Sequence, residues 1–209
     1  MLLHAQIHVA IVMNISAQTA APIEGNYLEV RDSIQDGDLL YIRDGTSIWS
    51  RLTQLITRSP HYHVGVAVWM TDGCARRRLM ILEAHLGGRR LVTLSTYTPR
   101  GMDVIRPIFD FGTYSDEFIE FTGKVPYSLP DYLAVGMLEL LRIRLGNFRG
   151  EVCSELVSDY LARSPAFADI PAQSSPGKQY KWLAGHHSAV YIFAVRASKV
   201  SVNTHVPQT

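Results

Sequence analysis

The segment His61–Met70 alternates between two sets of side chains with a period of two, which is typical of a β-strand and not of a helix. One set is apolar and predicts a core face. The other set has Gly65 and Ala67 at its centre, which leaves room for a neighbouring element to approach closely. A polar loop follows, and residues 79–85 form a second apolar run. These residues therefore predict a β-hairpin.

The remaining patterns complete an α+β domain. Strands are predicted at 39–42, 89–94, 102–107 and 189–195, and helices at 47–57, 113–122, 130–145 and 152–163. Residues 164–188 are rich in Pro, Ser and Gly and predict mostly loop. We expect an antiparallel-rich sheet packed against helices on one side.

One domain accounts for the chain of 209 residues. We place it at residues 35–197, after an N-terminal arm at 1–34 and before a flexible tail at 198–209. The apolar start, Met1–Ile15, loosely resembles a secretory signal but lacks a basic n-region. The alternative is an arm that packs on the domain or on a neighbouring subunit in an assembly.

Charge and cysteine content narrow the class of protein. A net charge of +1 argues against binding nucleic acid by bulk charge. No apolar run reaches the ~18 residues of a membrane span. The two cysteines, Cys74 and Cys153, have no metal-site spacing, and we interpret them as free thiols made in a reducing compartment, with export or incorporation into a virion left open.

Cys153 begins an amphipathic helix after the turn at Gly150. A thiol there lies among unpaired backbone N–H groups at the positive end of the helix dipole, which favours the nucleophilic thiolate. Such a nucleophile needs an imidazole as base and a group that orients the imidazole.

His63 and Glu83 match that requirement. If the hairpin turns at Gly73, His63 lies directly opposite Glu83, with Cβ atoms ~4.5–5.5 Å apart. The carboxylate then holds one ring nitrogen and leaves the other for the thiol. A slip of one residue would destroy this pairing.

The same register offers a rival interpretation. His61, His63, Glu83 and His85 would project from one face and could bind zinc. No recognised zinc-site spacing is present, and this reading leaves Cys153 without a role. Each residue also has a structural alternative, since a single strand histidine or buried cysteine usually serves only packing. We expect no metal and no other cofactor.

Five short blocks resemble a known family. They are Gly37–Ile42, Ser59–Val66, Leu82–Ala84, Pro126–Tyr127 and Cys153–Val157. They are similar to the circularly permuted NlpC-type papain-like hydrolases, which include YiiX-like proteins and, more distantly, lecithin retinol acyltransferase-like enzymes.

This resemblance implies that Cys153 is the nucleophile, His63 the base and Glu83 the residue orienting His63. It implies that Tyr127 lies by the oxyanion site, although Ser128 stands where the family often has an acidic residue. The implied activity is cleavage of amide bonds through a thioester, with peptidoglycan stem peptides as the leading substrate. The setting could be a phage or prophage virion whose hydrolase acts on the cell wall. The alternatives are a lipid-directed thioesterase or acyltransferase, and a structural or assembly subunit that retains the hydrolase fold.

Overall fold

The computed structural model describes residues 23–85, 88–109, 120 and 152–197. Its centre is a seven-stranded sheet with the order β1-β7-β6-β2-β3-β4-β5. All neighbouring strands are antiparallel except β1, which runs parallel to β7. The strands are β1 (Ile23–Gly25), β2 (Leu39–Ile42), β3 (His63–Thr71), β4 (Arg77–His85), β5 (Gly88–Thr93), β6 (Met102–Pro107) and β7 (Ala189–Val195).

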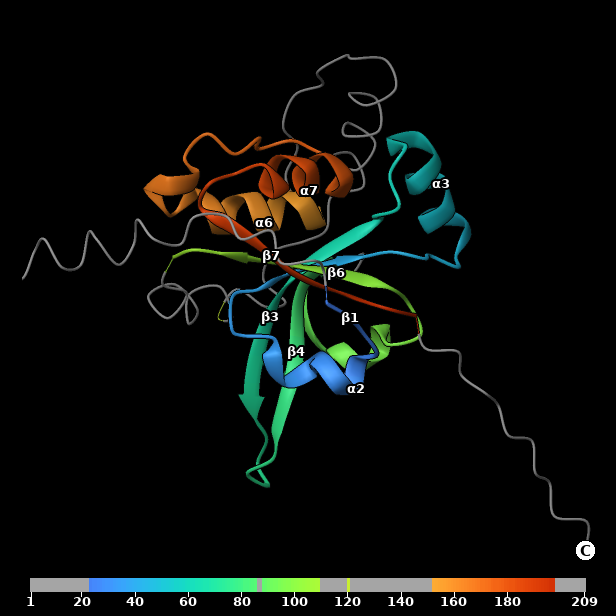
Figure 1. Cartoon of the computed structure of the whole chain (residues 1–209), viewed down its shortest axis with the longest axis vertical. Coiled ribbons are helices and arrows are strands. Elements are labelled where there is room, and N and C mark those ends of the chain that lie inside the picture. Colours follow the sequence, from blue (N-terminus) through green and yellow to red (C-terminus); the bar gives the residue numbers. More distant parts are fainter. Residues whose placement is uncertain (1–22, 86–87, 110–119, 121–151, 198–209) are drawn as a thin grey trace, which may run out of the picture.

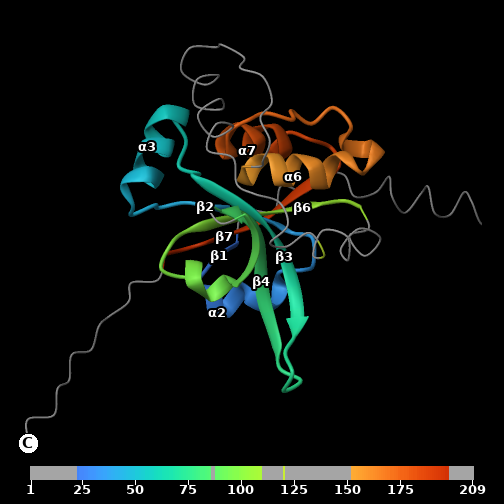
Figure 2. The same ribbon diagram turned by 180° about the vertical axis from the view of Figure 1, so that it is seen from behind.

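Helices cover both faces of the sheet (Figures 1 and 2). Helices α6 (Cys153–Ala162) and α7 (Pro176–Ala184) lie on one face with the 3₁₀ helix η3 (Pro165–Phe167). The other face packs against α2 (Tyr27–Val30) and carries the 3₁₀ helices η1 (Arg31–Ser33) and η2 (Leu94–Tyr97). Each face therefore has its own apolar core. The α+β class predicted from the sequence is confirmed, whereas the expectation of helices on only one side of the sheet was wrong, because α2 covers the second face.

Two segments depart from the predicted outline. Helix α7 lies inside residues 164–188, for which the sequence predicted mostly loop and no helix, so this helix was missed. The sequence does contain the pattern of a helix start at this point, because the Ser175 side chain caps the helix and Pro176 occupies its first position. Residues 23–34 of the predicted arm are packed on the domain, where Tyr27, Val30 and Ile34 are buried. Residues 1–22, the tail at 198–209 and the helix predicted over 130–145 lie outside the described residues.

The β3–β4 hairpin turns one residue later than predicted. Val66 pairs with Leu82, a register shifted by two residues, so the turn centres on Cys74 and not on Gly73. The Asp72 carboxylate fixes the position of the turn, because it accepts hydrogen bonds from the backbone N–H groups of Cys74 and Arg76. A shift of two residues keeps every side chain on its predicted face.

Gly65 lets strand β4 approach closely, as its small size predicted. A Cβ atom at this position would lie 2.6 Å from both Ile81 Cγ1 and the backbone oxygen of Leu82. The backbone oxygen cannot move aside without displacing β4, on which Glu83 lies one residue further along.

We expect Gly65→Ala to lower the free energy of unfolding by about 1–3 kcal/mol, because the added methyl group overpacks the sheet. Urea denaturation followed by circular dichroism measures this change. Gly73→Ala is the matched control, since nothing lies within 4 Å of a Cβ atom there. Equal stabilities of the two variants would contradict the packing argument.

Helix α3 (Ile48–Thr57) connects β2 to the loop before β3 and has an unusual orientation. Its buried side chains are Ser50 and Thr53, whereas Ile48, Trp49 and Leu55 are exposed. The helix thus presents its apolar face outward. None of the helices among the described residues has the length and apolar character to cross a membrane.

Candidate active site

Cys153 occupies the first position of α6. The helix follows Val152, whose extended backbone precedes the first turn, and the Glu155 carboxylate accepts a hydrogen bond from the Val152 N–H at 3.1 Å. One side of α6 is buried in the core through Leu156, Val157, Tyr160 and Leu161. Cys153 is a half-buried free thiol, and it lies at the end of a helix that the core holds firmly in place.

His63 and Glu83 form a buried hydrogen-bonded pair. The distance from His63 Nε2 to Glu83 Oε2 is 2.7 Å, and the glutamate side chain is fully buried. The predicted partners therefore meet although they are not directly opposed in the ladder. The long glutamate side chain spans the diagonal left by the two-residue shift, because diagonal neighbours on one face remain within reach.

Two further residues, Tyr97 and Arg90, fix the Glu83 carboxylate. The Tyr97 hydroxyl donates to Oε2 at 2.6 Å, and Arg90 donates to Oε1 at 2.8 Å. The Tyr97 ring also stacks on the His63 ring, with centroids 5.8 Å apart. Burial by itself would raise the pKa of Glu83, but the hydrogen bond and positive charge of His63, with the Tyr97 and Arg90 hydrogen bonds, lower that pKa to about 2. The carboxylate is therefore ionised and held in one orientation.

Cys153 is the second partner of His63. Burial would lower the pKa of His63, but the negative charge of the Cys153 thiolate, a hydrogen bond with that side chain, and Glu83 raise it to about 10. Since Glu83 takes Nε2, Nδ1 is the ring nitrogen left for the sulfur. The site thus brings together a thiol, an imidazole and a carboxylate, the groups that a cysteine nucleophile needs.

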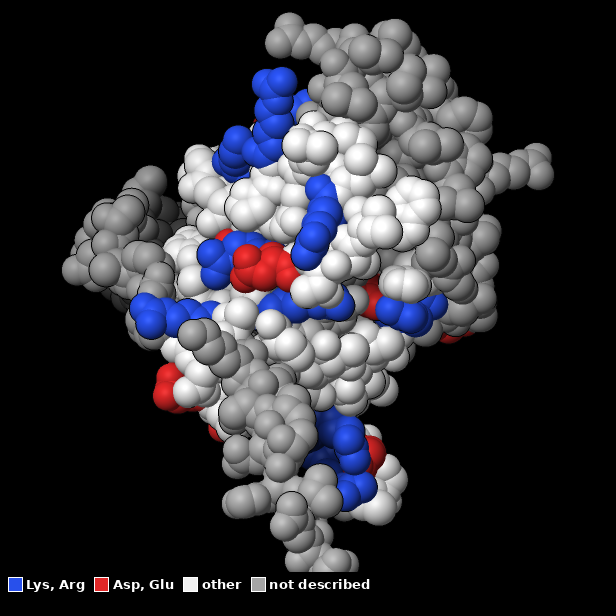
Figure 3. Space-filling model, turned by 90° about the vertical axis from the view of Figure 1, so that its right-hand side faces the viewer, with Lys and Arg blue, Asp and Glu red and all other residues white. Residues whose placement is uncertain are grey.

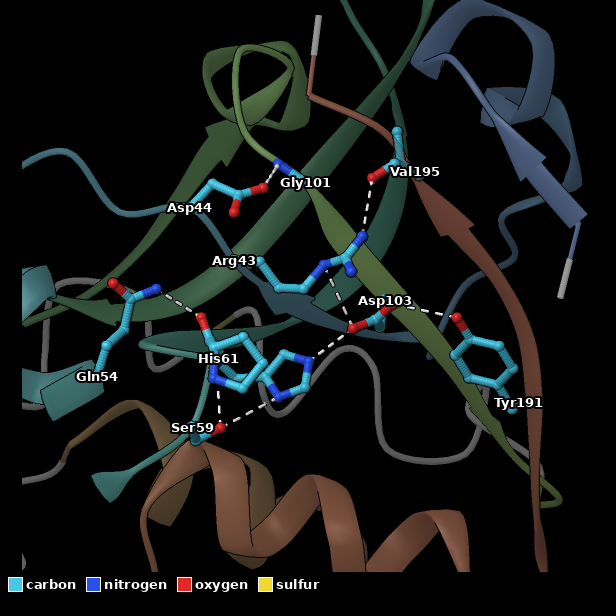
Figure 4. Close-up of polar contacts among 10 residues, drawn as sticks. Arg43, Asp44, Gln54, Ser59, His61, Gly101, Asp103, Tyr191 and Val195 are labelled. Carbon is cyan, nitrogen blue, oxygen red and sulfur yellow. Dashed lines mark hydrogen bonds and ion pairs between the residues drawn. The ribbon is translucent and has the colours of Figure 1, made fainter. Parts of the chain in front are cut away.

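His61, two residues before His63, belongs to a second histidine–carboxylate pair (Figure 4). His61 Nε2 is 2.6 Å from Asp103 Oδ2, and both residues are buried. The Tyr191 hydroxyl donates to Oδ1 of the same carboxylate, and Arg43 Nε lies 3.4 Å from Oδ2 without forming a hydrogen bond. Ser59 Oγ accepts a hydrogen bond from the His61 backbone N–H. This network anchors the chain two residues before His63.

The zinc interpretation does not fit these contacts. His61 binds Asp103 and His63 binds Glu83, so the two imidazoles turn to different carboxylates. His85 ends β4 opposite Gly88 of β5. Within the part of the chain that the structure describes, no group of three or more His, Cys, Asp or Glu residues could hold a metal ion.

Helix α7 contacts both segments that carry the site. Gln179 is fully buried, and its Nε2 donates to the Ser154 carbonyl at 2.8 Å and to the Ser158 hydroxyl at 2.9 Å, both in α6. At the start of α7, Gly177 packs against Ser59, since a Cβ atom there would lie 2.1 Å from Ser59 Oγ. Helix α7 therefore sets the position of the cysteine helix relative to the loop that leads to His63.

We expect Gln179→Leu to lower the free energy of unfolding by about 2–4 kcal/mol, because the Ser154 carbonyl and Ser158 and Tyr41 hydroxyls lose buried partners. Chemical denaturation measures the loss, and Lys181→Gln, an exposed change on the same helix, serves as the control. A Gln179→Leu protein as stable as this control would show that the network contributes little.

Sequence reasoning missed several of these residues. Arg90 lies opposite Glu83 in the β4–β5 pairing, so a hairpin register around the glycine pair would have identified it. Tyr97, Asp103 and Gln179 carry no local signal, because each reaches the site through tertiary packing. Tyr127, Ser128 and the turn at Gly150 lie outside the described residues, so the oxyanion role of Tyr127 stays a prediction.

The fold and these contacts define an α+β protein with a cysteine, a histidine and a glutamate at one site. No protein-family model matches the sequence, and no curated protein is significantly similar to it. Among solved structures, the chain is similar to the metalloprotein YiiX from Escherichia coli O157:H7, labelled DUF1105. The two share 17% sequence identity with a TM-score of 0.35, over 63% of this chain and 66% of YiiX.

The chain thus spans just under two-thirds of the length of YiiX.

Proposed function

We propose that this protein is a cysteine hydrolase that cleaves amide bonds through a thioester. The observation that supports this most is the buried chain of contacts from Cys153 to His63 and from His63 to Glu83. A structural protein gains little from placing an ionised carboxylate, an imidazole and a half-buried thiol in contact, whereas a nucleophile needs all three.

The mechanism follows from the positions of these groups. The Cys153 thiolate attacks the carbonyl carbon, and N–H groups in the first turn of α6 stabilise the oxyanion. Collapse of this intermediate breaks the C–N bond while the His63 imidazolium protonates the leaving amine. Neutral His63 then takes a proton from water, whose oxygen attacks the thioester and releases the acid and the thiolate. Tyr127 is the proposed second oxyanion donor.

Peptidoglycan stem peptides are the proposed substrate, by analogy with NlpC-type enzymes, and action during phage or prophage entry is one setting for it. The second candidate is a lipid-directed thioesterase or acyltransferase. The exposed apolar face of α3 favours it, because this helix leads directly into the loop before His63. A structural subunit that retains the fold is the third.

A substrate panel separates these candidates. The purified protein is incubated with muropeptides and, separately, with acyl thioesters and phospholipids, and products are identified by mass spectrometry. We expect new amino and carboxyl ends in the muropeptides and a hydroxylamine-sensitive adduct on Cys153. Turnover of acyl lipids without cleavage of muropeptides would favour the second candidate, the lipid-directed thioesterase or acyltransferase, over the peptidase. An inert Cys153 in a large assembly would favour the structural role.

A further inference from the structure

Helix α3 exposes the residues that a helix of a globular protein usually buries. Ile48 is 82% exposed, Leu55 75% and Trp49 68%, while Leu52 is 38% exposed. At 100° per residue these four side chains and Ile56 fall within one arc of the helix. Solvent contact with such a continuous apolar surface is unfavourable, so this arc marks an interaction site.

Contacts of the polar side of α3 fix the outward orientation of its apolar arc. The buried hydroxyl groups are satisfied locally, since Ser50 Oγ donates to the Ser47 carbonyl and Thr53 Oγ1 donates to the Trp49 carbonyl. Ser50 packs against Gly45, where a Cβ atom would lie 2.3 Å from the serine side chain. A rotation that buried the apolar arc would replace this small contact by large side chains. The domain is therefore shaped to receive the polar side of α3.

Charge on this part of the surface indicates the partner. Helix α3 contains no Asp or Glu, and the exposed residues Arg51 and Arg58 lie on one flank of the apolar arc. Asp44, in the loop before the helix, accepts a hydrogen bond from the Gly101 N–H. Figure 3 shows this side of the molecule, where uncharged and basic side chains predominate in the upper part, which includes α3, and acidic side chains appear among basic ones near mid-height. Two copies packed symmetrically through this face would bring their arginines together.

We propose that α3 docks on an anionic phospholipid surface. Aliphatic side chains and a tryptophan on one face, with arginines beside them, are the composition of helices that lie in a membrane interface. The apolar arc would enter the boundary between headgroups and acyl chains, and Arg51 and Arg58 would contact lipid phosphates. Docking would bring the loop at residues 58–62, and with it the site at His63, to the lipid surface. This inference does not depend on the proposed hydrolase activity.

Co-sedimentation of the full chain with vesicles tests it. We expect binding to vesicles of phosphatidylcholine with phosphatidylglycerol, and at least tenfold weaker binding to phosphatidylcholine alone. Trp49→Ser combined with Leu55→Ser lowers binding to the anionic vesicles at least tenfold. Arg51→Glu lowers it about fivefold or more, the factor expected for one basic residue near a charged surface.

Leu28→Ser is the matched control, because Leu28 is 81% exposed on α2, away from α3, and its loss leaves binding unchanged. All four substituted side chains are exposed, so unfolding midpoints should match the parent protein. Absence of binding, or binding that survives the double substitution, overturns the proposal. If sedimentation velocity shows a dimer that the double substitution dissociates, the apolar arc binds a second copy of the chain and the proposal is overturned. If Trp49 is shielded from acrylamide in the absence of lipid, a segment of this chain covers the arc and the proposal is likewise overturned.

Discussion

We expect Cys153→Ala to abolish the proposed hydrolysis, with a fall in kcat/KM of roughly 10⁴-fold or more, because the thioester forms on the Cys153 sulfur. The fold persists, since the side chain is small and only half-buried. The substrate panel measures the loss of activity, and the unfolding midpoint measures the stability. Full activity in Cys153→Ala would remove Cys153 from the mechanism.

Cys74 provides the matched control. It is the other free thiol, exposed in the β3–β4 turn and far along the hairpin from His63, so Cys74→Ala leaves activity unchanged. In that background iodoacetamide modifies Cys153 alone. We expect His63→Asn to slow this modification at pH 6 more than tenfold, because the imidazolium no longer stabilises the thiolate. An unchanged modification rate would show that His63 does not stabilise the Cys153 thiolate.

We expect Glu83→Gln to lower kcat for the proposed hydrolysis by about 10²–10⁴-fold, because the neutral amide no longer stabilises the imidazolium or fixes its orientation. The pKa of His63, raised to about 10, falls in this variant since one of its two negative partners is gone. Nuclear magnetic resonance titration of the His63 ring measures the change. Tyr97→Phe removes one hydrogen bond but keeps the charge, so both effects are smaller there. A His63 pKa that does not move in Glu83→Gln contradicts this account.

The same pair gives stability a defined pH dependence. The folded-state pKa of His63 lies above its ordinary value of 6.5, so its contribution is complete below pH 6.5 and is lost as pH rises through about 10. The pKa of Glu83 is lowered from 4.5 to about 2, so its contribution is complete above pH 4.5 and is lost as pH falls through about 2. The stability difference between the parent protein and Glu83→Gln is therefore largest between pH 4.5 and 6.5.

Local periodicity predicted much of the sheet and the cysteine helix. Strands β2 and β7 occur at the predicted residues, and α6 begins within one residue of its prediction. His63 and Glu83 lie together as strand alternation predicted, although the predicted hairpin register was wrong. The predicted turn was off by two residues in register, but side-chain direction in a strand repeats every two residues, so the partners stayed on one face.

Features outside that local periodicity required the folded structure. Helix α7 was hidden by its Ser and Pro residues, although these form its cap and first turn. His61 was grouped with His63 by strand alternation, yet it lies before β3 begins and turns to Asp103, 42 residues away. Helix α3 was predicted from the spacing of its apolar residues, but spacing does not say which face meets the domain.

The sequence by itself determined that Cys153 begins a helix and that His63 and Glu83 share a face of one hairpin, because these properties depend on neighbours within about 20 residues. Only the tertiary structure decided which ring nitrogen of His63 contacts Glu83, that Tyr97 and Arg90 hold the carboxylate, and that α3 turns its apolar arc outward. Those outcomes depend on contacts between distant segments, where the shape and polarity of the whole domain outweigh local preference.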